Sequence, residues 1–178
     1  MTSESKTNRL VMAAMMTCLI AVATIFFKIP IPFANGYVHL GDGMIFLAVL
    51  LLGVRRGAAA AAVGSAMGDV LGGFAIWAPW TFVIKGVMAL LMGALMLFLQ
   101  KRGAVKPAAA RCVGMTLAGF WMVLGYFVAE GLIYGNWIIA LLGAPWNAGQ
   151  FAVGIALALA LSSSLGKTPV RRHFYGGI

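Results

Sequence analysis

Residues 68–86 read GDVLGGFAIWAPWTFVIKG and separate two long apolar runs. The stretch carries a carboxylate, Asp69, and an ammonium group, Lys85, among glycine, proline and tryptophan residues. Charged side chains at membrane depth are costly and persist mostly where they pair or take part in function. The stretch therefore predicts a turn between two membrane helices that also forms one wall of a substrate site.

The composition requires a lipid environment. Of the 178 residues, 62% are hydrophobic and 10% are charged, whereas soluble domains carry about 25% charged residues. The apolar runs are continuous and lack period-two alternation, which favours helices over a β-barrel. The formal charge of +9 would suggest nucleic acid in a soluble protein. Here the basic residues lie between apolar runs, so membrane topology explains them and no nucleic-acid partner is expected.

Six apolar segments predict six transmembrane helices, which makes the chain an all-α integral membrane protein. The expected helices cover residues 10–27, 44–53, 57–73, 79–100, 112–133 and 146–165. The second is short and extends back toward Asp42. Together they form one membrane domain, residues 9–166, between polar tails at 1–8 and 167–178.

Basic residues set the expected orientation. If the N-terminus is inside, eleven of the 13 Lys and Arg residues fall in cytoplasmic segments. Such asymmetry is typical of multi-pass proteins of the plasma membrane. The sequence therefore predicts cytoplasmic N- and C-termini and outer loops at 28–43, 73–79 and 134–146.

Polar and aromatic residues gather at the expected outer helix ends. With a rise of 1.5 Å per residue, Lys85 lies roughly 9 Å from the start of its helix. A pocket open to the outside would use flat aromatic rings to stack on a planar ligand and polar groups to orient it. The candidate substrate-binding residues are Tyr37, His39, Asp42, Asp69, Trp77, Trp80, Lys85, Glu130, Tyr134, Trp146, Asn147 and Gln150.

Simpler interpretations stand beside these assignments. Tyr and Trp also form belts at any membrane interface. Lys85 and one acid can make a structural ion pair, and His39 can cap its loop. Ala13, Thr17 and Ala21 recur every four residues, a spacing that lets another helix approach closely. That helix belongs either to a partner or to the chain itself.

Enzyme chemistry finds little support. The two histidines do not form a zinc-binding pattern with carboxylates at helical spacing. The segment LGKT at residues 165–168 resembles the end of a phosphate loop, but Leu161 stands where that loop requires glycine. Cys18 and Cys112 are isolated within apolar runs. We expect no catalytic residue, metal or cofactor, and ATP hydrolysis, if needed, would belong to another subunit.

Several motifs together resemble a known family. They are YVHLGD at 37–42, GVRRG at 53–57, GSAMGD at 64–69, WAPWTFVIKG at 77–86, and PWN at 145–147 followed by Gln150. In this order, on six short helices, they resemble the substrate-binding (S) components of energy-coupling factor (ECF) vitamin transporters. The resemblance is nearest to members assigned to pyridoxine or to hydroxymethylpyrimidine, the thiamine precursor.

The resemblance implies a monomeric subunit that binds a small planar vitamin near the outer face. It implies an ECF transmembrane coupling subunit and two ATPase subunits as partners. The first outer loop, about residues 30–43, would be a lid, and the face made by Ala13, Thr17 and Ala21 would contact the coupling subunit.

Three other functions remain to be weighed against a binding subunit of an ATP-driven importer. A stand-alone secondary transporter would use Asp69, Glu130 and Lys85 for ion coupling, but no repeat of two halves is apparent. A membrane enzyme lacks the catalytic pairs. A purely structural subunit leaves the one-sided polar layer unexplained.

Overall fold

The computed structural model describes residues 6–31, 37–103 and 105–169. These residues form six helices and one short two-stranded sheet, which confirms the predicted all-α class. The helices are α1 (Lys6–Phe26), α2 (Gly41–Leu52), α3 (Val54–Leu71), α4 (Ala78–Lys101), α5 (Pro107–Tyr134) and α6 (Trp137–Leu165). The strands are β1 (Lys28–Pro30) and β2 (Tyr37–His39).

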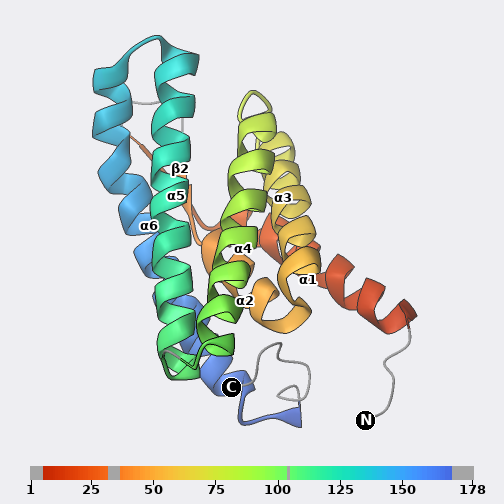
Figure 1. The fold of residues 1–178 in the computed structure, drawn as a ribbon. Coiled ribbons are helices and arrows are strands. Elements are labelled where there is room, and N and C mark those ends of the chain that lie inside the picture. The colour runs from red at the N-terminus through yellow and green to blue at the C-terminus, as the bar shows by residue number, and fades with distance from the viewer. Residues whose placement is uncertain (1–5, 32–36, 104, 170–178) are drawn as a thin grey trace.

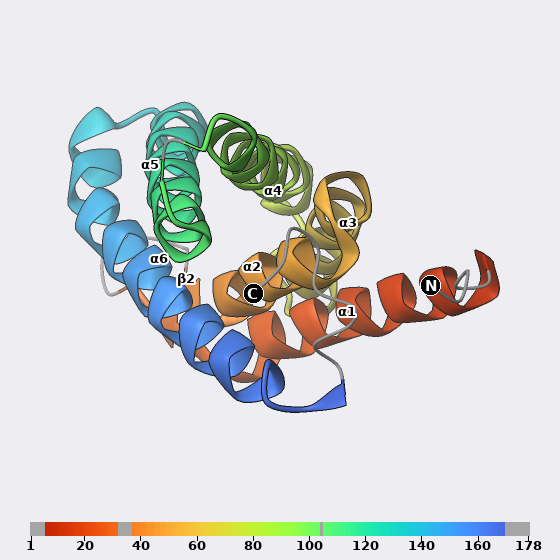
Figure 2. The same cartoon turned by 60° about the horizontal axis from the view of Figure 1, so that its bottom comes forward.

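The helix α2 lies inside a bundle formed by the other helices (Figures 1 and 2). Neighbouring helices pack in the order α1, α3, α4, α5 and α6, and α2 packs against α1, α3, α4 and α6. Nearly every residue of α2 is buried. At 12 residues, α2 is about 18 Å long, so it lies within the bundle without crossing the bilayer core alone.

Among the described residues, α1, α4, α5 and α6 are long and apolar enough to cross a membrane. The helix α3 has 18 residues but carries Arg55 and Arg56 in its first turn and Asp69 near its end. Of the two remaining helices, α2 is shorter and α3 is more polar than these four.

Small residues let α3 approach α1 closely. A methyl group at Gly64 would lie 2.7 Å from the carbonyl oxygen of Thr17, and one at Gly68 would lie equally close to the Thr24 side chain. Ala21 is buried, and the Thr17 hydroxyl donates to the carbonyl of Ala13 at 2.9 Å. Much of the small-residue face expected for a partner thus packs within the chain.

The predicted start of the last helix was wrong. The helix α6 begins at Trp137, where the sequence prediction placed residues 134–146 in an outer loop. Gly135 adopts a left-handed φ of 62° at the end of α5. The Asn136 side-chain oxygen then accepts from the amides of Ile138 and Ile139, which caps α6. Pro145 lies inside the helix, although proline more often marks a first turn.

Other boundaries moved by smaller amounts. The helix α5 begins at Pro107 rather than residue 112, because proline suits the first turn of a helix. The helix α1 begins at Lys6, so part of the expected tail is helical. The remainder of both expected tails, residues 1–5 and 170–178, lies outside the described residues, as do residues 32–36 of the expected lid.

The described part of that lid is a hairpin followed by the start of α2. Its strands pair antiparallel, with Lys28 opposite His39 and Pro30 opposite Tyr37. The amide of Leu40 donates to the carbonyl of Phe27 at 3.2 Å, which ties the hairpin to the end of α1.

Candidate functional site

A cavity lies between the hairpin, the end of α3, the start of α4, the last turns of α5 and the first half of α6. Its lining residues are Ile31, Tyr37, His39, Asp69, Trp77, Thr81, Tyr126, Glu130, Asn147 and Gln150. The space between their atoms, with the open mouth of the cavity included, is about 400 Å³. The free volume at its centre is only about 30 Å³, room for one or two water molecules. A ring-sized ligand therefore requires the hairpin or lining side chains to shift.

Aromatic rings form much of the wall. The Trp77 ring lies 6.1 Å from that of Tyr126 and 6.0 Å from that of Tyr134, measured between centroids. The Tyr37 ring lies 4.5 Å from that of Phe74. Rings at these separations and tilts pack favourably and offer flat surfaces to a planar ligand.

Two buried carboxylates lie in the lining, and each is only 4% exposed. The Tyr37 hydroxyl donates to Asp69 Oδ1 at 2.6 Å, and the Asn147 amide donates to Glu130 Oε1 at 3.3 Å. The second oxygens, Asp69 Oδ2 and Glu130 Oε2, have no hydrogen-bond partner among the described residues. Because buried polar atoms are nearly always bonded, these two oxygens are available acceptors.

Glycine makes room for one of these carboxylates. A methyl group at Gly143 would overlap the carboxyl of Glu130. Asn147 lies one turn further along α6 and donates both to Glu130 and to the carbonyl of Gly143, the latter at 3.4 Å. The register of α6, set by its cap at Asn136, therefore positions the Glu130 carboxyl.

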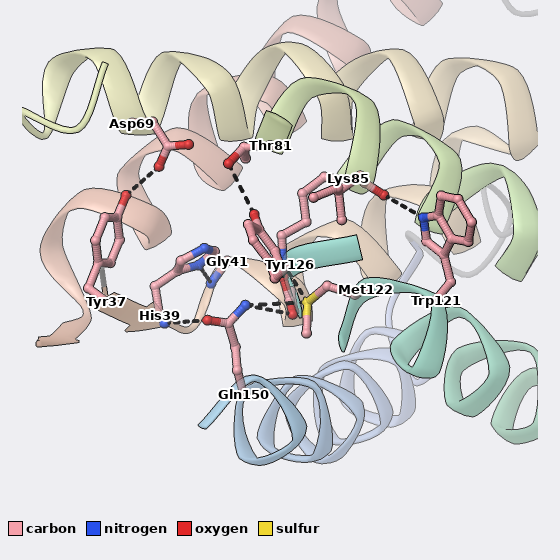
Figure 3. Close-up of polar contacts among 12 residues, drawn as sticks. Tyr37, His39, Gly41, Asp69, Thr81, Lys85, Trp121, Met122, Tyr126 and Gln150 are labelled. Atoms are coloured by element: carbon pink, nitrogen blue, oxygen red, sulfur yellow. Dashed lines mark hydrogen bonds and ion pairs between the residues drawn. The ribbon is translucent and has the colours of Figure 1, made fainter. Parts of the chain in front are cut away.

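The cavity floor is a polar network (Figure 3). Lys85 forms an ion pair with Asp42 Oδ1, and both side chains are fully buried. The Lys85 ammonium also lies 2.8 Å from the sulfur of Met122. The Gln150 amide donates to Asp42 Oδ2 at 2.9 Å, and its oxygen accepts from the His39 backbone amide at 2.9 Å. Gln150 thus links the floor to the hairpin.

The two titratable residues of β2, Tyr37 and His39, are held uncharged. Burial, with a smaller effect of Lys85, lowers the pKa of His39 to about 3. The neutral imidazole accepts from the Gly41 amide at its Nδ1 atom, at 3.0 Å. Burial, reinforced by Asp69, raises the pKa of Tyr37 above its usual value, so its phenol remains a hydrogen-bond donor.

The structure brings seven of the twelve predicted site residues to the cavity lining. Asp42 and Lys85 lie beneath it, in the floor. Trp80 is half-buried against the apolar core, and Tyr134 lies behind the lining residue Trp77, whose ring it contacts. Trp146 is 37% exposed and lines an adjoining, mainly apolar groove between α6 and the hairpin. The free volume of this groove is about 650 Å³, against about 30 Å³ for the cavity, and the two share His39 and Gln150.

The sequence prediction missed Ile31, Thr81 and Tyr126, which all line the cavity. Tyr126 lies four residues before Glu130, and Thr81 lies four before Lys85, so each shares a helix face with a predicted residue. Their hydroxyls lie 3.1 Å apart. Helical spacing from the charged residues would have found both.

Comparison with known proteins identifies the family. Residues 4–167 match the model of the family described as ECF-type riboflavin transporter, S component. The chain belongs to this S-component family. The predicted role as the substrate-binding subunit of a vitamin importer in the plasma membrane is thereby confirmed, and this S component is a transport subunit rather than an enzyme.

Two relatives and one solved structure are informative. This S component is 29% identical over 168 residues to the thiamine precursor transporter HmpT of Lactococcus lactis subsp. cremoris (strain MG1363), covering 94% of this chain and 93% of the relative. It is 37% identical over 116 residues to a Pyrococcus woesei protein described as an uncharacterized protein in gap 3′region, covering 65% and 74% of the two chains. A solved S component of a bacterial ECF transporter shares the fold with a TM-score of 0.72 at 22% identity, covering 91% of this chain and 97% of that one.

Proposed function

We propose that this S component captures a small heteroaromatic ring of the hydroxymethylpyrimidine or pyridoxine type in the cavity below the hairpin. The observation that carries the proposal is the cavity lining, in which aromatic rings accompany two carboxylates with free oxygens. Similarity to the Lactococcus protein named as a thiamine precursor transporter supports this choice of ring. The proposed ligand contacts are Tyr37, His39, Asp69, Trp77, Thr81, Tyr126, Glu130, Asn147 and Gln150.

The hairpin is the proposed lid. It supplies Tyr37 and His39 to the lining and is bonded to the rest of the protein through Asp69 and Gln150. Since the free volume at the centre is about 30 Å³, the ligand would enter as these bonds open and be enclosed when they close again.

The cavity is proposed to face the outside of the cell. It lies near the end of α3, the start of α4 and the end of α5. The α2–α3 and α4–α5 connections lie at the other end of the bundle (Figure 1), and both are flanked by basic residues. The positive-inside rule places such segments in the cytoplasm, and with them the chain termini.

The proposed partners are an ECF transmembrane coupling subunit and, through it, two ATPase subunits. Large apolar side chains are exposed along the outer face of α1: Leu10, Val11, Met15, Leu19 and Val22. This exposed face is our proposed contact with the coupling subunit, whereas Ala13 and Thr17 lie half-buried on the opposite side of α1. Ala21 is buried and would support α1 from within.

Uptake of labelled hydroxymethylpyrimidine into cells tests this function. We expect accumulation only when the coupling subunit and ATPases are co-expressed. Accumulation that persists without them and collapses with the proton gradient would instead favour a stand-alone secondary transporter.

A further inference from the structure

The cavity is acidic and its lining holds no counter-charge. Its two ionisable acids are Asp69 and Glu130, and no Lys or Arg is among its lining residues. The nearest cations are engaged elsewhere. Lys85 is fully buried against Asp42, and Lys28 donates to the carbonyl of Gly72 while standing over the Tyr37 ring.

Each acid has one oxygen bonded and one oxygen free. Tyr37 occupies Oδ1 of Asp69, while Oδ2 lies on the Thr81 side without a hydrogen bond (Figure 3). Asn147 occupies Oε1 of Glu130, while Oε2 has no partner among the described residues. The two acids come from different helices, α3 and α5, so they approach a bound ring from two sides.

Three side-chain donors of the lining are already committed to acceptors within the protein. The Gln150 amide donates to Asp42, the Asn147 amide to Glu130, and the Tyr37 hydroxyl to Asp69. A ligand that brought a negative charge would meet carboxyl oxygens without a partner, in a lining that contains no Lys or Arg. Leaving such groups unpaired costs more than a hydrogen bond gains.

From this arrangement we infer that the site prefers ligands that carry hydrogen-bond donors. The preferred ligand is a heteroaromatic ring with an amine, neutral or cationic, bound between Asp69 and Glu130. Phosphorylated forms of the same ring are rejected. The inference rests on the proposed function and narrows its ligand class. An amine can donate to the carboxyl oxygens that have no partner, whereas a phosphate ester would bury a negative charge in a lining that contains no Lys or Arg. The importer would accordingly take the dephosphorylated precursor, and a kinase reaction inside the cell would have to follow.

Two matched ligand pairs test the inference by titration calorimetry on the purified full-length protein. One pair is 4-amino-5-hydroxymethyl-2-methylpyrimidine and the same ring without the amino group; the other is pyridoxamine and pyridoxine. The phosphate ester of each amine-bearing compound is titrated as well. We expect at least one amine-bearing compound to bind about 10-fold or more tightly than its amine-free partner, the effect of one charged hydrogen bond, and its phosphate ester to bind more weakly still.

The variants Asp69→Asn and Glu130→Gln then locate the effect. Each keeps the side-chain size, and each should reduce the preference for the amine. The preference is a ratio within one protein preparation, so it is insensitive to the fraction that is folded. Gly149→Ala is the control, because a methyl group there meets nothing within 4 Å, and it should leave the ratio unchanged.

The outcomes separate the two proposals. Equal binding of amine-free or phosphorylated ligands, or an unchanged ratio in both acid variants, would overturn the donor-selective site while leaving a vitamin-binding subunit in place. Failure of all six compounds, together with riboflavin, to bind would overturn the proposed ligand site and this inference with it.

Discussion

The ion pair between Lys85 and Asp42 lies in the floor of the cavity, with both side chains fully buried. Four helices meet there, because Lys85 belongs to α4, Asp42 to α2, and the neighbouring Met122 and Gln150 to α5 and α6. The pair therefore connects four helices below the cavity, and we expect it to hold these helices and Gln150 in place.

Removing one member of the Lys85–Asp42 ion pair should strongly destabilise the folded protein. Lys85→Met leaves Asp42 as an uncompensated buried charge, for which we expect a loss of about 3–5 kcal/mol in the free energy of unfolding. Chemical unfolding in detergent measures it. The double variant Lys85→Met with Asp42→Asn should be less destabilised than the sum of the single changes. A native unfolding midpoint for Lys85→Met alone would show that the pair does not hold the bundle.

Tyr37→Phe should loosen the hairpin. It removes the hydroxyl that donates to Asp69 and keeps the ring that packs on Phe74. A hydrogen bond to a charged group contributes about 1.5–3 kcal/mol, so we expect ligand to dissociate roughly 10-fold faster or more, by stopped-flow fluorescence. An unchanged dissociation rate would mean that this bond does not hold the lid closed.

Two glycines in α6 offer a test substitution and its matched control. Gly143→Ala places a methyl group where the Glu130 carboxyl lies, whereas Gly149→Ala places one in open space. The first should weaken ligand binding about as much as Glu130→Gln, although no polar group is removed, and the second should have no effect. Equal affinities for the two alanine variants would contradict the assigned position of Glu130.

His39 should make the protein acid-sensitive. Burial lowers its pKa to about 3 in the folded protein, while an unfolded chain titrates near 6.5. Below about pH 6.5 the unfolded state therefore binds the extra proton, and stability falls as the pH drops toward the folded pKa. The melting temperature should decline more steeply between pH 7 and pH 5 for the wild-type protein than for His39→Asn. Parallel profiles would show that His39 is not buried as a neutral group.

The sequence predicted the helices of the fold more completely than it predicted the residues of the candidate site. The apolar runs predicted six helices because helix length and hydropathy are local properties. Pro145 misled the prediction of α6, since proline resembles a helix start and the real start depends on the Asn136 cap. The short α2 was recognised, although its central position depends on packing against four other helices.

In the candidate site, too, local sequence features could be predicted, whereas contacts that depend on packing could not. Tyr37, Asp69, Glu130 and Asn147 were predicted as site residues because polar groups gather at the expected outer helix ends, and the structure places all four in the cavity lining. The pairing of Lys85 with Asp42 rather than with Asp69 depends on the three-dimensional arrangement of α2 and α4. For the same reason Trp80 and Trp146 could not be told from the cavity residue Trp77, since the three differ only in the direction that each side chain faces.

The most direct test of the account is a calorimetric titration of the purified protein with 4-amino-5-hydroxymethyl-2-methylpyrimidine and pyridoxamine, compared with the variant Asn147→Ala. Asn147 donates to Glu130 from inside the cavity, so its loss frees and misplaces that carboxyl without removing an ion pair. We predict saturable one-to-one binding of at least one compound to the wild-type protein and an affinity at least about 10-fold lower in the variant. Identical binding by both proteins would contradict the placement of the ligand in this cavity.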